Sequence, residues 1–336
     1  MEKIIIIIIL IFMFKKNLFP NHLNRRKILK IIGFSMVGSL GYGTYNFVNN
    51  KQIKSTWTGE VLNAPAKLEI HGSTKSNNNK IIIKVEKLID KYENIFNLQN
   101  VNSEISQLNR EKYLAEPSKE LLDVLEKSLV LSKTTNGAFD VTVQPLWNFY
   151  FNHYILKQTK TPPTSTELAK VQKLVNWKNI NILENSITLN NNSSITLNGI
   201  AQGWITDQIT ELLKENGVKN TLVDFGENYA LGLYDNARPW RILLQGPANV
   251  TKVLDLSNKA VATSGGYGTM FEPTATYHHI FDAKTGLSAN KFKAVSILSN
   301  YAWLSDGIST SALSMEKIEL IKVCKTLKAS AYIVEK

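Results

Sequence analysis

Four segments of the chain carry more glycine, hydroxyl, carboxylate and imidazole groups than a structural scaffold needs. These segments are residues 137–145, 196–207, 263–286 and 305–310. The third holds two adjacent histidines, His278 and His279, and an unperturbed imidazole titrates near pH ~6.5, so it can transfer a proton near neutrality. Glycines beside hydroxyl groups also allow backbone amides to approach a phosphate. The alternative is a polar turn in which Asp282 and Thr285 accept hydrogen bonds from the backbone.

The last of these segments places a carboxylate and a hydroxyl on one face of a helix. Asp306 and Thr310 are four residues apart, and side chains at that spacing are neighbours on a helix. Oxygen donors of these two kinds suit a hard cation such as Mg²⁺. The alternative is that Asp306 caps the N-terminus of the helix, where the helix dipole favours a carboxylate.

The segment at residues 196–207 resembles a phosphate-binding loop that enters a helix. Its sequence LNGIAQG lacks both the G-x-G-x-x-G spacing of dinucleotide-binding folds and the Walker lysine. A helix N-terminus preceded by small residues can nevertheless bind an anion. The chain contains no G-x-S-x-G motif, so serine-hydrolase chemistry is a poor match.

The distribution of charge argues against a nucleic-acid-binding protein. The formal net charge is +11, but residues 1–54 carry nine basic side chains and one acidic side chain. The remaining 282 residues hold 30 basic and 27 acidic groups, so the body of the chain is nearly neutral. The single cysteine, Cys324, excludes an internal disulfide framework and a cysteine-based zinc site.

The helices and strands that position these segments are predicted to follow one another in an irregular order. Apolar residues at helical spacing predict helices at 80–98, 117–135, 199–216 and 303–315. Short β-rich runs predict strands at 221–226, 230–234, 240–245 and 293–299. The order is not a strict βαβ alternation, so the fold class predicted is α+β. Without an internal repeat or a Pro/Gly-rich linker, residues 55–336 are expected to form one domain.

Residues 1–54 have the pattern of an export leader. An apolar run of eleven residues at 4–14 is too short for a membrane-spanning helix, which needs roughly 20 residues. A basic stretch at 15–30 follows, and then a weakly apolar, glycine-containing stretch at 31–48. Residues 24–30, NRRKILK, resemble a twin-arginine signal, with Asn and Ile at positions that usually hold Ser/Thr and Phe.

This leader predicts export to the periplasm or to the outer face of the inner membrane, either free or anchored. No A-x-A cleavage site stands out near residue 50, so the leader could remain as an anchor. The alternative is a basic flank beside an ordinary membrane anchor. Met13 is a second candidate start, which would make the first apolar run dispensable.

Taken in order, the chemistry-bearing blocks resemble the FAD:protein FMN transferase family, the ApbE-type flavin transferases. The resemblance runs from about Thr58 to Met315. It rests on five blocks: Gly137–Leu146 (GAFDVTVQPL), Thr196–Trp204 (TLNGIAQGW), Ala262–Gly265 (ATSG), His278–Gly286 (HHIFDAKTG) and Ser305–Thr310 (SDGIST).

Several positions depart from the family pattern, among them residues 62–64 (LNA) in place of Met-Gly-Thr and Ala283 in place of a proline. Thr196 stands in place of an aspartate, Gln202 in place of a lysine, and Gln99 where a tyrosine is common. Glu227 replaces the second glycine of a Gly-Gly-Asn motif. The combination of residues 198–203 (NGIAQG) with residues 225–227 (FGE) resembles a NosX-like branch associated with nitrous-oxide respiration. For that branch the implied acceptor is the membrane flavoprotein that supports nitrous-oxide reductase.

The resemblance implies a reaction in which FAD and a protein threonine or serine give an FMN-protein phosphoester and AMP. It implies Mg²⁺ as cofactor, with Asp306, Thr310 and the Gly199 carbonyl as ligands. His279 is implied as the base that takes the acceptor hydroxyl proton, with His278 as the less favoured neighbour. The flavin-binding residues implied are Gln99, Ala138, Phe139, Asp140, Thr196, Gln202, Ser264, Gly265, Ile280, Asp282 and Thr285.

Two other functions would use the same residues. One is a non-catalytic flavin-binding or FAD-storage protein. The other is an FAD pyrophosphatase that uses water as acceptor and releases free FMN and AMP. Retention of the histidine together with Asp306 and Thr310 favours catalysis.

Overall fold

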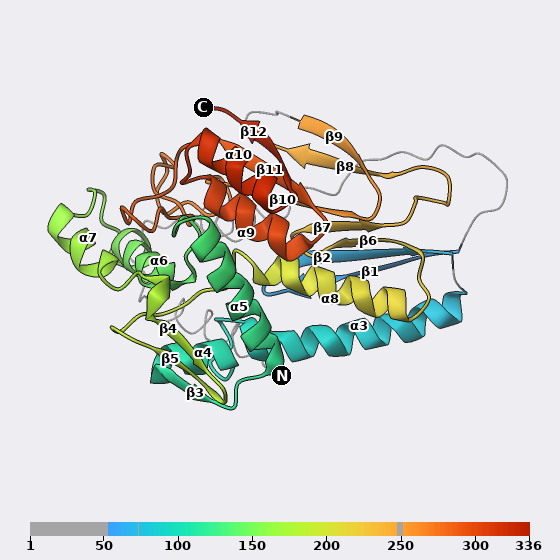
Figure 1. Ribbon diagram of the computed structural model, residues 1–336, viewed down its shortest axis with the longest axis horizontal. Coiled ribbons are helices and arrows are strands. Elements are labelled where there is room, and N and C mark those ends of the chain that lie inside the picture. Colours follow the sequence, from blue (N-terminus) through green and yellow to red (C-terminus); the bar gives the residue numbers. More distant parts are fainter. Residues whose placement is uncertain (1–52, 73, 247–250) are drawn as a thin grey trace, which may run out of the picture. The chain divides into compact units, whose positions relative to one another are not determined.

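A seven-stranded antiparallel sheet forms the centre of the computed structural model, which describes residues 53–72, 74–246 and 251–336 (Figure 1). The strand order is β1-β2-β6-β7-β10-β11-β12. The strands are β1 (Lys54–Val61), β2 (Ala64–His71), β6 (Asn220–Asp224), β7 (Asn228–Leu231), β10 (Lys259–Gly265), β11 (Ala294–Ser299) and β12 (Ser330–Val334). Every adjacent pair is antiparallel, so the α+β prediction is confirmed.

The two faces of this sheet bury different partners, because successive side chains of a strand point to opposite faces. Helices cover one face, where residues such as Val223 and Ile297 join the main hydrophobic core. The neighbouring residues Leu222 and Leu298 instead pack against a hairpin of β8 (Trp240–Gln245) and β9 (Thr251–Leu256). Figure 1 shows α3, α8 and α9 on one side of the strands and β8–β9 on the other.

The helices predicted from sequence are present with displaced ends. They are α3 (Lys75–Phe96), α5 (Lys119–Thr134), α8 (Ala201–Glu215) and α9 (Ala302–Ala312). The displacement follows local capping: α3 begins early because the Thr74 hydroxyl accepts a hydrogen bond from the Asn77 amide at 3.1 Å. The other helices are α4 (Glu104–Glu111), α6 (Gln144–Tyr150), α7 (Ser165–Gln172) and α10 (Lys317–Thr326), with short turns at Val141–Val143, Phe151–Leu156 and Trp177–Asn179.

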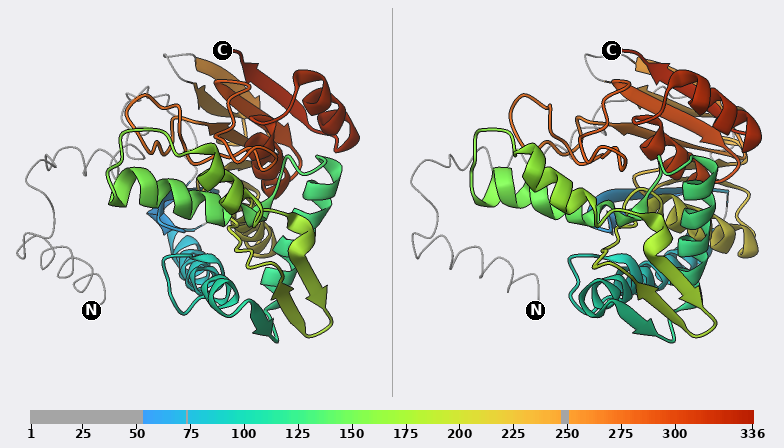
Figure 2. Two further views of the ribbon diagram at one scale, coloured as in Figure 1. Left: turned by 90° about the vertical axis from the view of Figure 1, so that its left-hand side faces the viewer. Right: turned by 60° about the vertical axis from the view of Figure 1, so that its left-hand side comes forward.

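A second layer is built from the middle of the chain. It contains a three-stranded sheet of β3 (Tyr113–Ala115), β5 (Ser186–Leu189) and β4 (Ile180–Leu183). A separate aromatic cluster around Tyr150 and Phe281 joins α6 to the loop that follows β10. In both views of Figure 2 the three-stranded sheet, in green and yellow-green, lies below the orange and red segment.

Helices α8 and α9 cross at a glycine, and this crossing supports a stability prediction. A Cβ at Gly203 would lie 2.4 Å from the Ala302 carbonyl oxygen and 2.8 Å from the Asp306 Cβ. Gly203→Ala should therefore lower the free energy of unfolding by about 1–3 kcal/mol, as overpacking of a core does. Urea denaturation measures this loss. Gln208→Ala on the same helix, at a half-buried position, should change stability by less than about 0.5 kcal/mol, and equal stability of the two variants would contradict the prediction.

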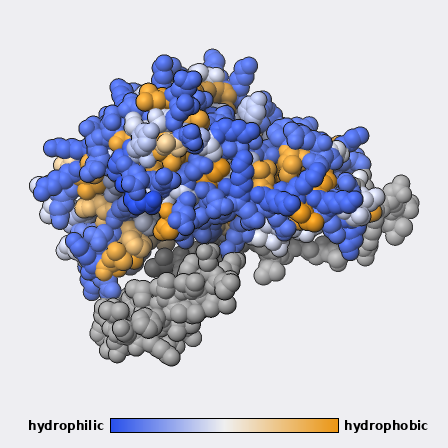
Figure 3. Space-filling view, turned by 90° about the horizontal axis from the view of Figure 1, so that it is seen from below, coloured by the Kyte–Doolittle hydropathy of each residue, from blue (hydrophilic) through white to orange (hydrophobic). Residues whose placement is uncertain are grey.

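The described part of the chain contains no helix that is both long and apolar enough to cross a bilayer. Figure 3 shows one face of the molecule, where hydrophilic residues predominate and apolar residues form small separate patches. The predictions made for residues 1–52, including the twin-arginine signal and the choice between Met1 and Met13 as start, lie outside the described residues.

Candidate functional site

All four chemistry-bearing segments meet at one cavity of about 430 Å³. The loop after α5, the loop that enters α8, strand β10 with its following loop, and helix α9 each contribute to its wall. The predicted site residues that line it are Ala138, Phe139, Asp140, Thr196, Gly199, Gln202, Ser264, Gly265, His279, Ile280, Asp306 and Thr310. Residues far apart in sequence are thus assembled into one site.

The three predicted cation ligands lie together in this wall. Asp306 and Thr310 project from one face of α9, and Gly199 lies opposite them. A Cβ at Gly199 would lie 3.0 Å from the Thr310 Oγ1, so the glycine allows the loop backbone to approach that hydroxyl. The Thr310 hydroxyl also lies 3.4 Å from the Ser264 Oγ. A hard cation that takes oxygen ligands fits a carboxylate, a hydroxyl and a backbone arranged in this way.

Asp306 is almost fully buried, and burial raises its pKa to about 7. The Gly203 amide donates a hydrogen bond to its Oδ2 at 3.1 Å, which favours the charged form, whereas the nearby Asp207 disfavours it. Within the described ranges no group of three or more His, Cys, Asp or Glu side chains could hold a metal ion. The candidate cation ligands differ from such a cluster, because they are the Asp306 carboxylate and two neutral oxygens, the Thr310 hydroxyl and the Gly199 carbonyl.

The alternative role of Asp306 as a helix cap is wrong, because α9 begins at Ala302. Asp207, on α8, performs the capping instead. Its two carboxylate oxygens accept hydrogen bonds from the Ala302 amide at 2.8 Å and the Trp303 amide at 2.9 Å. These bonds satisfy amides at the helix start that have no partner within the helix. Asp306 therefore lies in the second turn of α9, where its side chain faces the cavity.

His279 lines the cavity and holds its ring by one nitrogen. Its Nδ1 lies 3.1 Å from the Thr269 carbonyl oxygen and 3.2 Å from the Thr269 amide nitrogen, so it can donate to the first or accept from the second. In the tautomer that carries the proton on Nδ1, Nε2 is the basic nitrogen. Burial, with a smaller contribution from the adjacent His278, lowers the pKa of His279 to about 4. The folded environment therefore shifts the pKa of His279 below the value of about 6.5 for a free imidazole.

His278 is a structural residue by its contacts. Its ring is buried, with Nε2 3.3 Å from the Asn290 Oδ1 and Nδ1 accepting a hydrogen bond from the Ile280 amide at 3.3 Å. Burial also lowers its pKa. It does not line the cavity, so the structure favours His279 of the two histidines for contact with a substrate.

Asp140 is a predicted flavin-binding residue in the cavity, and both of its carboxylate oxygens accept hydrogen bonds from the protein itself. Its Oδ1 accepts hydrogen bonds from the Thr142 amide and hydroxyl, at 2.8 and 2.6 Å, and its Oδ2 accepts one from the Trp177 amide at 3.0 Å. Burial raises the pKa of Asp140, and these hydrogen bonds oppose that shift. Asp140 therefore fixes the cavity wall, while the polar groups of Thr196 and Gln202 line it nearby.

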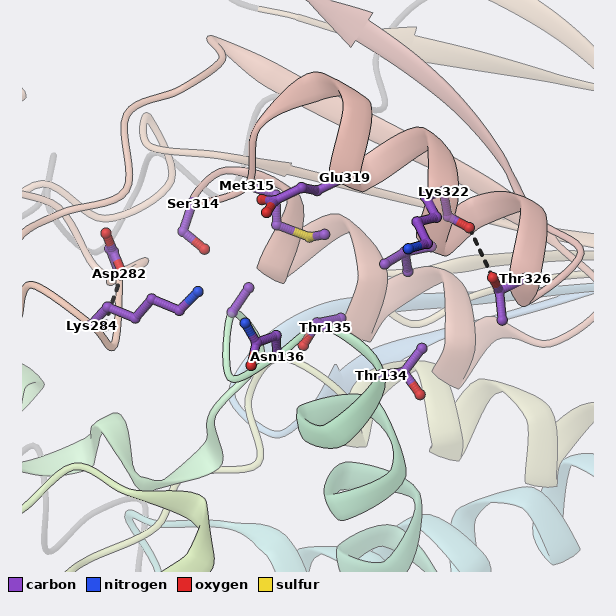
Figure 4. A pocket seen from close by; sticks show the side chains of 12 residues that line it. Thr134, Thr135, Asn136, Asp282, Lys284, Ser314, Met315, Glu319, Lys322 and Thr326 are labelled. Atoms are coloured by element: carbon purple, nitrogen blue, oxygen red, sulfur yellow. Dashed lines mark hydrogen bonds between the residues drawn. The ribbon is translucent and has the colours of Figure 1, made fainter.

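Three predicted flavin-binding residues lie outside this cavity. Gln99 is exposed in the turn after α3. Asp282 lines a second cavity of about 270 Å³, where its Oδ1 accepts a hydrogen bond from the Lys284 amide (Figure 4). Thr285 is exposed, and its hydroxyl accepts a hydrogen bond from the Leu287 amide. Asp282 and Thr285 therefore form the polar turn that was the alternative interpretation of this segment, because their side-chain oxygens accept hydrogen bonds from backbone amides of that turn.

Among the lining residues that sequence reasoning did not name as site residues are Trp147, Glu227 and Tyr267. The aromatic residues fall outside the motifs, where nothing in the local pattern distinguishes a cavity wall from a core. Glu227 carried a signal, because it departs from the family pattern at a glycine position. Burial, followed by the charges of Asp306 and Asp224, raises the pKa of Glu227 well above its ordinary value.

Comparison with known proteins agrees with this geometry. The model of the ApbE family matches residues 62–333. Two relatives named FAD:protein FMN transferase, from Vibrio cholerae and Haemophilus influenzae, are 28 % and 29 % identical, and each match covers 69 % of this chain and 72 % of the relative.

Solved structures share the fold. The flavin transferase ApbE from Vibrio cholerae superposes with a TM-score of 0.73 at 22 % identity, over 85 % of this chain and 94 % of that one. The apo flavinyl transferase ApbE from Pseudomonas stutzeri superposes with a TM-score of 0.74 at 21 % identity, over 86 % and 93 %. With a family match across most of its length, the chain belongs to the ApbE family.

Proposed function

We propose that the chain is an FAD:protein FMN transferase, which joins the FMN half of FAD to a hydroxyl of an acceptor protein and releases AMP. The observation that carries the proposal is the meeting of His279, Asp306, Thr310 and Gly199 at one cavity. A base and a set of oxygen donors are the two parts that hydroxyl attack on a diphosphate requires. The relatives named for this activity support it, since the chain matches 72 % of the length of each.

A divalent cation, which we propose to be Mg²⁺, completes the site. The described residues that line the cavity include three carboxylates, Asp140, Glu227 and Asp306, and no lysine or arginine. The diphosphate of FAD is negatively charged, so its binding beside these carboxylates requires a counter-charge. Asp306, Thr310 and the Gly199 carbonyl would hold the cation, which when bound would neutralise charge on the diphosphate.

The residues of the chain then have separate tasks. Backbone amides near Ser264 and Gly265, and the polar groups of Thr196 and Gln202, orient FAD in the cavity. The Nε2 of His279 takes the proton of the acceptor threonine or serine hydroxyl, and the hydroxyl oxygen attacks the FMN-side phosphorus. The bond from that phosphorus to the bridging oxygen breaks, and AMP leaves with this oxygen.

Incubation of the full chain with FAD, Mg²⁺ and an acceptor domain tests the function, with covalent flavin detected by in-gel fluorescence. We propose as first acceptor the membrane flavoprotein of nitrous-oxide respiration. Labelling of the acceptor together with AMP release is the expected result. AMP and free FMN without labelling would indicate an FAD pyrophosphatase, and bound FAD without AMP would indicate a non-catalytic flavin-binding protein.

Export through the leader is a separate proposal with its own prediction. Arg25 and Arg26 precede a weakly apolar stretch, as in signals that export folded proteins. Changing both to lysine should leave the protein in the cytoplasm, which fractionation with immunoblotting measures. A single change of Lys30 to alanine is the control and should still permit export. Normal export of the double variant would indicate an ordinary secretory route.

A further inference from the structure

Glu227 is a buried carboxylate with one oxygen lacking a partner. The side chain is only 8 % exposed. The Thr263 amide donates a hydrogen bond to the carboxylate, whereas Oε2 has no hydrogen-bond partner. Across the described residues the only other buried side-chain atom in this condition is the neutral Asn78 Oδ1. A buried carboxylate with an unpartnered oxygen is strongly unfavourable unless it gains a proton or a cation.

The position of Glu227 favours a cation over a proton as the partner of its carboxylate. Glu227 ends the turn between β6 and β7, and it lines the same cavity as Asp306, Thr310 and Gly199. Its carboxylate is close enough to Asp306 for the two charges to repel each other. No lysine, arginine or histidine in the described ranges forms an ion pair with either carboxylate. Two buried carboxylates that face one cavity without a counter-charge match a divalent cation.

The backbone around Glu227 is fixed in a way that suits a ligand. The Glu227 carbonyl oxygen accepts hydrogen bonds from the Phe225 amide at 3.2 Å and the Thr206 hydroxyl at 3.4 Å. The preceding Gly226 has φ +92°, and the Gln202 side chain lies against it. With its backbone held and its carboxylate bonded to the Thr263 amide, the side chain has little freedom to reorient.

We propose that Glu227 supplies a second carboxylate to the divalent-cation site of this chain, with Oε2 as the ligand atom. This inference rests on the proposed function, since it concerns the same cation. Of the residues that depart from the pattern of the resembled family, Thr196, Gln202 and Glu227 all line this cavity.

Metal binding to the full chain, without FAD or acceptor, tests the proposal directly. After removal of metal by chelation, Mn²⁺ is titrated and free Mn²⁺ is followed by electron paramagnetic resonance, with Mg²⁺ as competitor. Glu227→Gln keeps the size and the Thr263 hydrogen bond but removes the charge. It should weaken binding by about 10–100-fold, the range found when partners of a metal site are lost. Asp306→Asn should weaken binding by at least as much.

Glu120→Gln is the matched control. Glu120 is a buried carboxylate near the start of α5 that forms an ion pair with Lys91, and it does not line the cavity. This variant should bind Mn²⁺ like the parent. Thermal unfolding of the metal-free proteins shows whether each variant folds. Metal-free Glu227→Gln should be more stable than the metal-free parent, because glutamine is neutral without taking up a proton or a cation.

The outcomes separate this inference from the proposed function. Parent-like Mn²⁺ binding by a folded Glu227→Gln, with loss in Asp306→Asn, overturns the role of Glu227 alone. Parent-like binding with lost flavin transfer in Glu227→Gln also overturns it and would make Glu227 a proton acceptor. A parent protein that binds neither Mn²⁺ nor Mg²⁺ overturns the cation site as a whole.

Discussion

Replacing Asp306 with alanine should reduce Mg²⁺-dependent flavin transfer by more than about 100-fold, since losing even an outer partner of a metal site costs about 10–100-fold. The carboxylate is the charged donor among the three candidate ligands, and it faces a cavity wall without lysine or arginine. Acceptor labelling is measured over a range of Mg²⁺ concentrations. Part of the loss should be recovered at high Mg²⁺, because the hydroxyl of Thr310 and the Gly199 carbonyl remain.

Two matched variants make the result interpretable. Asp306→Asn keeps the size and an oxygen that can accept the Gly203 amide hydrogen bond, so it isolates the charge. Thr310→Val keeps the shape and removes the hydroxyl, and it should cause a smaller loss than Asp306→Ala. Circular dichroism should show that all three variants fold. Activity of Asp306→Ala at ordinary Mg²⁺ would contradict the ligand assignment.

His279→Gln should lower the rate of transfer by about 10²–10⁴-fold, the usual contribution of a general base. Glutamine preserves size and hydrogen bonding at the Thr269 backbone but cannot take the acceptor proton. Binding of FAD should persist, because it depends on other residues of the cavity and on the cation. Single-turnover transfer at saturating FAD and FAD affinity are measured on the same variant.

If His279 has only a structural role, the effects on rate and on FAD affinity should be reversed. On that view the variant would lose FAD affinity or stability and keep its rate at saturating FAD. His278→Gln is the comparison variant, because His278 is buried and does not line the cavity. It should affect stability more than the rate. Near-normal transfer by His279→Gln would assign the proton to another group.

The pH dependence tests the same assignment. With the pKa of His279 lowered to about 4, the ring is neutral and able to accept a proton above about pH 5. This group should therefore raise the rate only as pH increases through about 4, and not near 6.5. The lowered pKa also means that folding stability is lost as pH falls from about 6.5 toward 4, because the unfolded chain binds the proton first. A rate increase near pH 7 that remains in His279→Gln would belong to another group.

The sequence by itself determined the class of fold and most of the candidate site. Apolar spacing located α3, α5, α8 and α9, because burial of one helix face depends on residues close together in the chain. The motifs were readable for the same reason: Asp306 and Thr310 lie on one helix face wherever that helix packs. Twelve of the residues that the motifs and the family resemblance implied for the site line the cavity.

Only the tertiary structure decided which polar residues serve the site and which serve the scaffold. Asp207 lies within the helical pattern of α8, where nothing in the sequence marks it as a cap. It nevertheless accepts a hydrogen bond from the first amide of α9, 95 residues further along the chain. Asp282 and Thr285 belong to the same motif as His279, but their oxygens are used by their own turn. The low pKa of His279 and the unpartnered oxygen of Glu227 also arise from burial among distant segments. Such properties depend on solvent exclusion and on contacts across the fold, which the order of residues along one segment does not contain.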